Sequence, residues 1–590
     1  MEDRRNLRSL VSTSMNRRQL MQRAALLGVS MPIFGSLIAA CEFDDDVVDD
    51  TVDDDEPAVD PDDEDDVADD PDDDEPVDVA DDDEPVDDDD DVADDDRYGG
   101  RMIAMGHHSI DSLHPDDVGQ TVAWTAITQI HDGLVAVDEN FEIEMELATD
   151  YQISDDGLEY TIELREGVLF HDGEDFNAED VVYTYEWYKD PDNAAISAAD
   201  FEAVDTIEMP DDYTVVINMS EPDSSFLRRG MLSMIVPEHY HSDVGYDGHS
   251  GEPIGTGPYQ LVEWNPDDFT LVEAFEDHWR GRPYIDEFEV RIVPEGSVRV
   301  LELETGGADT SIWVAGTDDE VRLVEEPHLT SYVTEALAVN NFPMNNTRPQ
   351  FDDRRVRQAL MFALDREQII ETIFVGAATL ATGNLAPSLE EWYEPDVPQY
   401  DYDPDRAIEL LEEAGWEEGD DGIRERDGER LEWECLVFVG DEVRRPQAEM
   451  AVEYWSAIGA DVGIREVSAA SAEMRDGSGD MALHNWTYGG AQGEPDARAT
   501  LQTGGGNNFT HFSNEEMDDL LEQGVAEVDP EARREIYSQV QQLFAEEVPT
   551  LFQMHWDWFN HFNERIHGLP DDLLSGSNLY RKVHEMWIEE

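Results

Sequence analysis

An acidic stretch at residues 42–96 most constrains what this chain of 590 residues can fold into. It contains 35 Asp and Glu residues and no Lys or Arg. A segment of this composition cannot bury a core, and its like charges push the chain apart. We therefore predict a disordered acidic tether over residues 42–97, ahead of a folded part that begins at residue 98. An acidic tail that binds other proteins is the alternative, and the position ahead of the fold favours the tether.

Residues 1–41 are predicted to be an export signal rather than part of the fold. Arg17 and Arg18 precede an apolar stretch at residues 24–40, which resembles a twin-arginine (Tat) signal. That stretch is shorter than the roughly 20 apolar residues a spanning helix needs. It ends in Leu-Ile-Ala-Ala before Cys41, which resembles a lipobox, so we expect Cys41 to be lipidated and to anchor the chain at the outer face of the cytoplasmic membrane. A cleaved signal with an incidental cysteine is the alternative.

The folded part is strongly acidic in its own right. The first 23 residues carry a net +4, so residues 97–590 still hold −77 of the total charge of −108. Such self-repulsion destabilises a fold in dilute buffer, and it is screened in concentrated salt, where the Debye length falls to about 3 Å at 1 M. We interpret the charge as that of a protein from a hypersaline habitat, of haloarchaeal type. It argues against nucleic-acid binding, which needs Lys and Arg.

Local patterns indicate an α/β fold for the rest of the chain. Residues 213–219 are rich in β-branched side chains and predict a strand. Capping residues predict several helix starts, as Ser, Asp or Asn ahead of an amphipathic pattern. These starts are Asn177, Asp365, Asp403, Ser513 and Asp529. No repeat of 20–50 residues is visible, which excludes solenoids and propellers, and two cysteines exclude a disulfide framework.

Six segments carry a recognisable order of residues. They are residues 158–182, 253–264, 279–286, 351–366, 402–415 and 455–459. Together they resemble the family 5 extracellular solute-binding proteins of ABC importers for dipeptides, oligopeptides and nickel, over about residues 110–570. Most of these residues are expected to be structural. Gly255-Thr256-Gly257-Pro258, for example, is predicted to form a tight turn in which only Gly tolerates a positive φ.

The resemblance implies an α/β fold with two lobes, of the periplasmic-binding-protein type II, and an extra subdomain in lobe one at about residues 138–235. Lobe one would span residues 98–336, lobe two residues 337–552, and residues 553–590 would return to lobe one. Strands at residues 336–341 and 550–554 would cross between the lobes. Such proteins close about a hinge on their ligand. The expected protein is a monomeric, non-catalytic receptor without a cofactor, which hands a small solute or peptide to the importer's permease subunits.

Candidate ligand residues follow from the aromatic and polar segments that the resemblance places at the cleft. We predict Trp486, Tyr488, Asn485, Trp313, Asn341, Phe509, His511, Trp556 and Trp124 as ligand contacts. Peptide-binding relatives usually place an Asp just after a Trp-x-Gly, to pair with the peptide's α-amine. This chain has Tyr488-Gly489-Gly490 there, and the nearest acids are Glu494 and Asp496. The departure argues against a free-amine peptide held at that point.

An exported hydrolase of halophilic type is the main alternative. No nucleophile-elbow, zinc-protease or P-loop motif is present, and we expect no catalytic residues. Two histidine groups could in principle bind a metal, namely His107-His108 with His114 and Glu238-His239-Tyr240-His241. Neither has Cys ligands or a helical i, i+4 pair, so we predict surface loops and no metal site.

Overall fold

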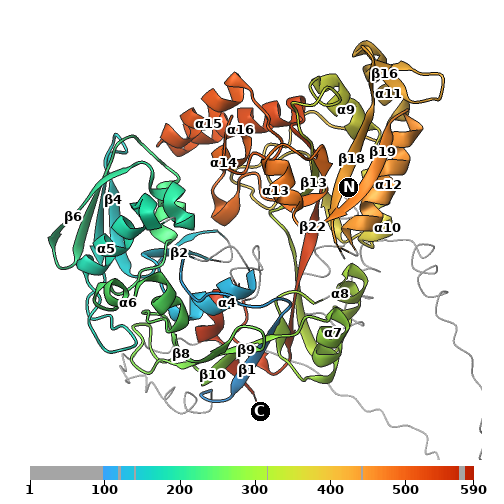
Figure 1. Ribbon diagram of the computed structural model, residues 1–590. Coiled ribbons are helices and arrows are strands. Elements are labelled where there is room, and N and C mark those ends of the chain that lie inside the picture. Colours follow the sequence, from blue (N-terminus) through green and yellow to red (C-terminus); the bar gives the residue numbers. More distant parts are fainter. Residues whose placement is uncertain are drawn as a thin grey trace, which may run out of the picture. The chain divides into compact units, whose positions relative to one another are not determined.

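A computed structural model describes residues 97–116, 121–138, 141–193, 195–314, 316–439, 441, 443–570 and 579–589 (Figure 1). The predicted export signal, the lipidation site at Cys41 and nearly all of the predicted tether lie outside these residues. Within the described residues, no helix has both the length and the apolar character needed to cross a membrane.

Lobe one is built on a mixed sheet with the strand order β8-β9-β10-β1-β11. Within it, β1 runs parallel to its neighbours β10 and β11, whereas β9 pairs antiparallel with both β10 and β8. The apolar face of α4 supplies much of the core against this sheet, through Val122, Ile127 and Ile130. The elements of this lobe are β1 (Arg101–Gly106), α4 (Thr121–Ile130), β8 (Tyr259–Asn265), β9 (Phe269–Ala274), β10 (Glu287–Ile292), α7 (Gly296–Thr305), β11 (Thr310–Ser311), α8 (Thr317–Leu323), β12 (Leu329–Glu335), β23 (Ile566–His567) and β24 (Trp587–Ile588).

The predicted subdomain has a sheet and a core of its own. Four antiparallel strands lie in the order β4-β5-β7-β6. The predicted strand at residues 213–219 is β7, in which every second residue is buried. Asn177 caps α5 as predicted. The Asp180 carboxylate accepts a hydrogen bond from the Asn177 main-chain N–H, which completes a capping box. The elements are β2 (Val135–Val137), β3 (Ile143–Met145), β4 (Ala148–Ile153), β5 (Glu159–Leu164), α5 (Ala178–Lys189), β6 (Val204–Asp211), β7 (Thr214–Met219) and α6 (Glu238–Gly251).

Lobe two surrounds a second core with helices and small sheets. Asp365, Asp403 and Asp529 cap α10, α11 and α16 as predicted. The prediction for Ser513 is wrong by one residue, because Asn514 accepts the hydrogen bonds from Glu516 and Met517. The strands are β13 (Val339–Pro343), β14 (Ala378–Leu380), β15 (Glu417–Glu418), β16 (Arg424–Arg426), β17 (Glu429–Arg430), β18 (Glu432–Phe438), β19 (Asp461–Val467), β20 (Met481–Ala482) and β21 (His484–Trp486). The helices are α9 (Arg354–Phe362), α10 (Arg366–Ile373), α11 (Pro404–Glu413), α12 (Arg444–Ala457), α13 (Ala470–Arg475), α14 (Arg498–Leu501), α15 (Glu515–Ala526) and α16 (Pro530–Glu547).

One long strand, β22 (Thr550–Asn563), belongs to both lobes (Figure 1). Up to Trp556 it pairs with β13 and β14 of lobe two. From Asp557 onward it pairs with β12, and near its end with β11, of lobe one. The chain crosses a second time at residues 336–338, the short link between β12 and β13. Among the described residues, these two crossings connect the lobes, and we call them the hinge.

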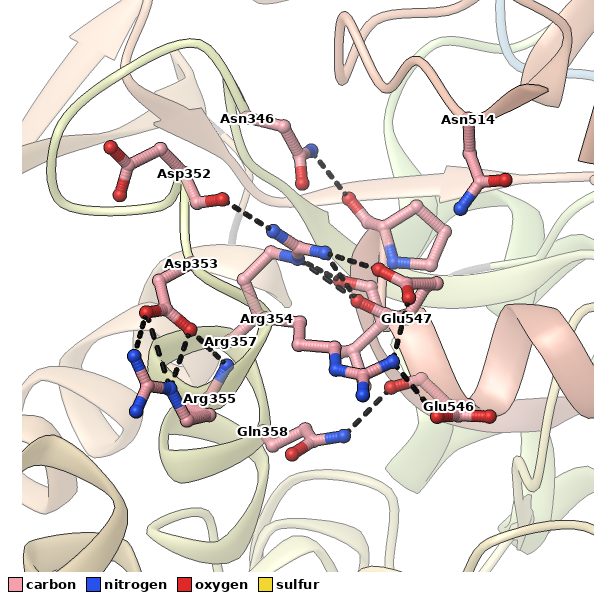
Figure 2. A network of polar contacts seen from close by, with 12 residues as sticks. Asn346, Asp352, Asp353, Arg354, Arg355, Arg357, Gln358, Asn514, Glu546 and Glu547 are labelled. Carbon is pink, nitrogen blue, oxygen red and sulfur yellow. Dashed lines mark hydrogen bonds and ion pairs between the residues drawn. The ribbon is translucent and has the colours of Figure 1, made fainter. Parts of the chain in front are cut away.

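A network of polar contacts holds the chain where it leaves α16 and enters β22 (Figure 2). Arg357 on α9 is buried, and its guanidinium donates to the main-chain oxygens of Glu547, Val548 and Phe351 and to the Glu547 carboxylate. The Asn346 side-chain amide donates to Pro549 O at 2.9 Å. These bonds satisfy carbonyl groups that the end of a helix leaves free. They therefore anchor residues 547–549, directly ahead of β22, to α9 and to Asn346 of lobe two.

The glycines of residues 255–258 are needed for a different reason from the one predicted. Neither Gly255 nor Gly257 has a positive φ. A Cβ atom on Gly255 would lie 2.1 Å from Ile130 O, and one on Gly257 would lie 2.5 Å from Ile130 C. The expectation of a positive φ at these glycines is thus wrong. The two glycines instead allow the main chain to approach the end of α4.

Candidate functional site

A cavity of about 40 Å³ lies at the hinge, where residues of both lobes meet. We call it the hinge pocket. Lobe one contributes side chains from β11 to α8, lobe two contributes Phe374, Ala377 and Val443, and β22 runs along it. The lining residues are Ile312, Trp313, Thr317, Glu320, Phe374, Ala377, Val443, Trp556, Asp557, Trp558 and Phe559.

Three tryptophan rings dominate the hinge pocket. The Trp313 ring centroid lies 5.7 Å from that of Trp556 and 5.7 Å from that of Trp558, with interplanar angles of 59° and 78°. Phe374 lies 6.0 Å from Trp556. Because the rings are tilted rather than stacked, their faces do not cover one another. The pocket is therefore apolar-walled, as small-molecule sites usually are.

A few polar groups are held in fixed positions beside these rings. The Glu320 carboxylate accepts from Val314 N at 3.2 Å and lies 3.0 Å from His561 Nε2. The Arg444 guanidinium lies 5.4 Å from the Trp556 ring centroid and pairs with Asp441 at 2.5 Å. A polar anchor on an otherwise apolar wall is what orients a bound solute.

The structure brings two of the predicted ligand residues, Trp313 and Trp556, together in the hinge pocket. Asn485 and Trp486 lie on β21, which pairs with β13 of lobe two. The Asn485 side-chain oxygen and the Trp486 indole N–H are buried and have no hydrogen-bond partner among the described residues. They offer one acceptor and one donor, which is what a peptide group needs.

Of the predicted ligand residues, only Trp313 and Trp556 are among the described residues that line the hinge pocket, and Asn485 and Trp486 do not line it. Tyr488 is buried, and its hydroxyl donates to Asn341 Oδ1 at 3.0 Å inside lobe two. Phe509 packs edge-on against Trp486, and His511 Nε2 lies 2.8 Å from Met474 O. Trp124 is on α4 beneath the Arg581 guanidinium. The polar groups of Tyr488, Asn341 and His511 thus bond within the protein, and a ligand role for these residues stays a prediction.

Sequence reasoning missed several lining residues of the pocket. Trp558, Phe559 and Asp557 follow Trp556 directly on β22, and the predicted crossing strand stopped at residue 554. Continuing the aromatic run from Phe552 to Phe559 as one strand would have found Trp558 on the same face as Trp556. Nothing in the local sequence points to Phe374 or Glu320, because both reach the pocket only through the fold.

A second junction between the lobes is made of ion pairs, and we call it the rim cluster. It consists of Asp200, Asp223 and Arg229 from the subdomain and Asp496 and Arg498 from lobe two. Arg229 reaches Asp496 at 3.1 Å, and Arg498 reaches Asp223 at 3.2 Å. Burial by itself would raise the pKa of Asp496, but Arg498 and Arg229 beside it bring that pKa below its usual value. The carboxylate is therefore charged and held by two cations.

The prediction that these histidines lie in surface loops is wrong for His114 and His241, which are buried, whereas His107 and His239 are exposed. The Nε2 atoms of His114 and His241 lie 3.0 Å apart, and Tyr183 Oη lies 2.8 Å from His241 Nδ1. His131 and His249 pack nearby, and together with His114 and His241 they form what we call the histidine nest. Among the described residues, no group of three or more His, Cys, Asp or Glu side chains is arranged to hold a metal ion.

The hydrogen bonds of His114 and His241 in the histidine nest can all form only when both rings are neutral. Asp116 N donates to His114 Nδ1, so the proton of neutral His114 lies on Nε2 and is donated to His241 Nε2. The proton of His241 then lies on Nδ1 and faces Tyr183. Burial lowers the pKa of His241 to about 4 and, together with His241, that of His249 to about 3.

Comparisons with known proteins agree with this architecture. The family model described as "Bacterial extracellular solute-binding proteins, family 5 Middle" matches residues 142–508. Heme-binding protein A of Haemophilus influenzae is 28% identical over 470 residues, covering 75% of this chain and 84% of that protein. The oligopeptide-binding protein AppA of Bacillus subtilis is 29% identical over 436 residues, covering 71% and 79%.

Solved structures with the same two-lobed fold include several with bound ligands. AppA from Bacillus subtilis in complex with a nonapeptide has a TM-score of 0.74 at 24% identity, covering 84% of this chain and 100% of that one. NikZ from Campylobacter jejuni in complex with Ni(L-His) has a TM-score of 0.74 at 24% identity, covering 82% and 99%. The relatives are binding proteins and not enzymes, which sets the exported hydrolase aside. Because the family match spans more than half of the chain, the chain belongs to the family 5 extracellular solute-binding proteins.

Proposed function

We propose that this chain captures a small, peptide-like solute between its two lobes and delivers it to the permease of an ABC importer. The observation that carries the proposal is the hinge pocket, which is lined from both lobes and crossed by β22. A ligand in such a pocket contacts both lobes only when they are closed, so binding favours the closed state. AppA with a nonapeptide and DppA from Helicobacter pylori with the peptide STSA support a peptide-like ligand.

Trp313 and Trp556 act as apolar walls in this proposal. Asn485 and Trp486 act as the acceptor and donor for a peptide group of the solute. These four ligand contacts are held in place by Tyr488, Asn341, Phe509 and His511. Trp124 has a structural role in lobe one. The protein works as a monomer without a cofactor. The chain passes from one lobe to the other at residues 336–338 and 556–557.

The N-terminal residues attach this receptor to the membrane. We propose export by the Tat route and lipidation of Cys41, with residues 42–97 as a tether that holds the lobes within reach of the permease. The extracellular setting of the family supports export, and the acidic surface suits a salt-loving organism. A Cys41→Ser chain expressed in its own host should leave the membrane fraction, and a variant that stays there would contradict lipid anchoring.

Thermal unfolding of the full chain in molar KCl tests the ligand class. Di-, tri- and longer peptides, glutathione, haem and nickel–histidine are each added in excess. A ligand that binds only the folded state stabilises it by about 2.7 kcal/mol at a hundred times its Kd. We expect an upward shift of Tm with peptides, and small-angle scattering should show a smaller radius with the same solutes. No shift with any of these solutes would contradict the proposal.

A further inference from the structure

The subdomain contacts lobe two at the end of α15, where main-chain hydrogen bonds add to those of the rim cluster. A helix leaves its last four carbonyl groups without partners inside the helix. At α15, Ser224 N of the subdomain donates to Val525 O at 2.8 Å, and Ser224 Oγ donates to Glu527 O at 2.6 Å. The neighbouring carbonyl, Gly524 O, instead accepts from Arg533 of lobe two itself. Two carbonyl groups at this end of α15 therefore take their donors from the other lobe.

A glycine of lobe two allows a second close approach to the subdomain. A Cβ atom on Gly493 would lie 2.9 Å from Arg228 Nη1 and 2.9 Å from Phe141 Cβ, both in the subdomain. Both distances are well below van der Waals contact. The same Arg228 Nη1 donates to Gln492 O of lobe two at 3.2 Å. Only a residue without a Cβ lets the main chain of lobe two come this close to the subdomain.

The ion pairs of the rim cluster are divided so that the lobes can part without leaving an arginine alone. Arg229 pairs with Asp200 at 2.6 Å inside the subdomain, as well as with Asp496 across the contact. Arg498 pairs with Asp496 at 2.9 Å inside lobe two, as well as with Asp223 across the contact. Each guanidinium thus keeps one carboxylate when the lobes separate, and opening does not leave a buried cation unpaired, which would be costly. The pairs across the contact can therefore break and form again.

We propose that residues 223–229 of the subdomain form a latch on residues 492–498 and on the end of α15, and that this latch favours the closed state of the lobes even when no solute is bound. We call this contact the subdomain latch. It consists of the Ser224 hydrogen bonds, the close approach at Gly493 and the ion pairs of the rim cluster. None of these residues is among the described residues that line the hinge pocket. The inference goes beyond the proposed function, since it assigns a role to the subdomain and needs no solute.

Hydrogen exchange of the full chain in molar KCl without solute tests the subdomain latch, with single amides resolved by fragmentation mass spectrometry. The Ser224 amide has its partner in lobe two and exchanges when the lobes part, whereas the amides of β7 exchange when the subdomain itself unfolds. We expect the Ser224 amide to exchange about tenfold more slowly than an unstructured amide and about tenfold faster than those of β7. No protection overturns the inference, because the contact then does not form. Exchange as slow as that of β7 also overturns it, because the contact is then permanent.

Gly493→Ala forces the subdomain latch apart and has a matched control. The added methyl group collides with Phe141, and the φ of +74° strains an alanine. Gly504→Ala, at a φ of +81° with no atom within 4 Å of the added Cβ, brings the same strain without the collision. We expect Gly493→Ala to speed exchange of the Ser224 amide about tenfold and Gly504→Ala to change it less than twofold, with β7 unaffected in both. Equal effects of the two substitutions overturn the inference.

Ser224→Ala breaks the subdomain latch more gently, because it removes only the bond to Glu527 O. Exchange at residue 224, taken relative to the intrinsic rate of the new residue, should rise about threefold, as expected for one lost hydrogen bond. Ser154→Ala, whose hydroxyl bonds to Asp156 inside the subdomain, is the control. If Ser224→Ala speeds the exchange no more than Ser154→Ala does, the bond to α15 does not hold the lobes together and the inference is wrong.

Discussion

The two junctions between the lobes, the hinge pocket and the rim cluster, have opposite chemistry. At the hinge pocket, two continuous chain segments and a set of aromatic rings join the lobes. At the rim cluster, the subdomain meets lobe two through ion pairs such as Arg229–Asp496 and Arg498–Asp223. Ring packing tolerates changes of angle, whereas buried ion pairs lose most of their energy when a partner moves away. The ring contacts of the hinge pocket therefore depend less on the angle between the lobes than the ion pairs of the rim cluster do.

The largest expected effect breaks the rim cluster. Asp496→Ala leaves Arg229 and Arg498 without their shared carboxylate in a buried place. The free energy of unfolding should fall by about 3 kcal/mol, because the charge-assisted hydrogen bonds of a buried carboxylate are lost, while Arg229 keeps Asp200 and Arg498 keeps Asp223. Urea unfolding in molar KCl measures this. Glu466→Ala, in the exposed Arg445–Glu466 pair, is the control and should cost about 0–1 kcal/mol. Equal losses in both variants would show that the rim cluster is an ordinary surface feature.

As the pH falls, the histidine nest of lobe one should lose stability before either junction between the lobes does. The folded pKa of His241 is depressed to about 4, so between about pH 6.5 and 4.5 the unfolded chain takes up a proton that the folded chain refuses. His241 should therefore lower the free energy of unfolding by about 2 kcal/mol over this range, and His249, whose pKa is lowered to about 3, adds to the loss. Asp180, whose pKa burial raises to about 6, acts in the opposite direction and offsets part of the loss. Asp496, with its lowered pKa, stays charged.

Unfolding by urea between pH 7 and 4.5 measures the acid effect. His241→Phe should reduce the pH dependence by the share of His241, because the substitution removes one of the nest histidines that must charge on unfolding, while His249 remains. His239→Gln, at an exposed histidine paired with Asp172, should leave the dependence as in the parent chain. A pH profile that His241→Phe does not change would rule out the nest as its source.

Removing the anchor of β22 should weaken the hinge side. Arg357→Ala leaves buried carbonyl groups at residues 547–548 without donors, and the free energy of unfolding should fall by about 2–3 kcal/mol. Arg354→Ala, in the same network but with exposed pairs to Glu546 and Glu547, is the matched control and should cost at most about 1 kcal/mol (Figure 2). If Arg357→Ala and Arg354→Ala lower the free energy of unfolding equally, the buried hydrogen bonds of Arg357 do not anchor β22.

The smallest expected effect sharpens the ligand side of the comparison. Trp313→Leu should weaken binding of the best peptide about tenfold, which is about 1.4 kcal/mol, because one wall of the hinge pocket is lost. Titration calorimetry measures the affinity. Trp124→Leu, on α4 and outside the pocket, should change the affinity by less than twofold. An equal loss at Trp124 would mean that the ligand lies elsewhere in lobe one.

Much of the fold could be predicted because its signals are local. Caps at Asn177, Asp365, Asp403 and Asp529 and the alternation of β7 follow from hydrogen bonding and side-chain direction within a few residues. The segment at residues 351–366 was recognised only as a family pattern, and the structure explains its Arg357 as the anchor of β22. Of the residues that line the hinge pocket, Trp313 and Trp556 were among the predicted ligand residues, and Trp558, Phe374 and Glu320 were not.

The sequence by itself determined the family, the α/β elements and the intense acidity of this protein, because each is written in neighbouring residues or in composition. Only the tertiary structure decided which side chains meet at the hinge pocket and at the rim cluster. Glu320, Phe374 and Trp558 come from three distant segments, and Arg229 finds Asp496 across 267 positions of the chain. Contacts of this kind depend on how whole elements pack around β22, and no local preference for helix or strand encodes them.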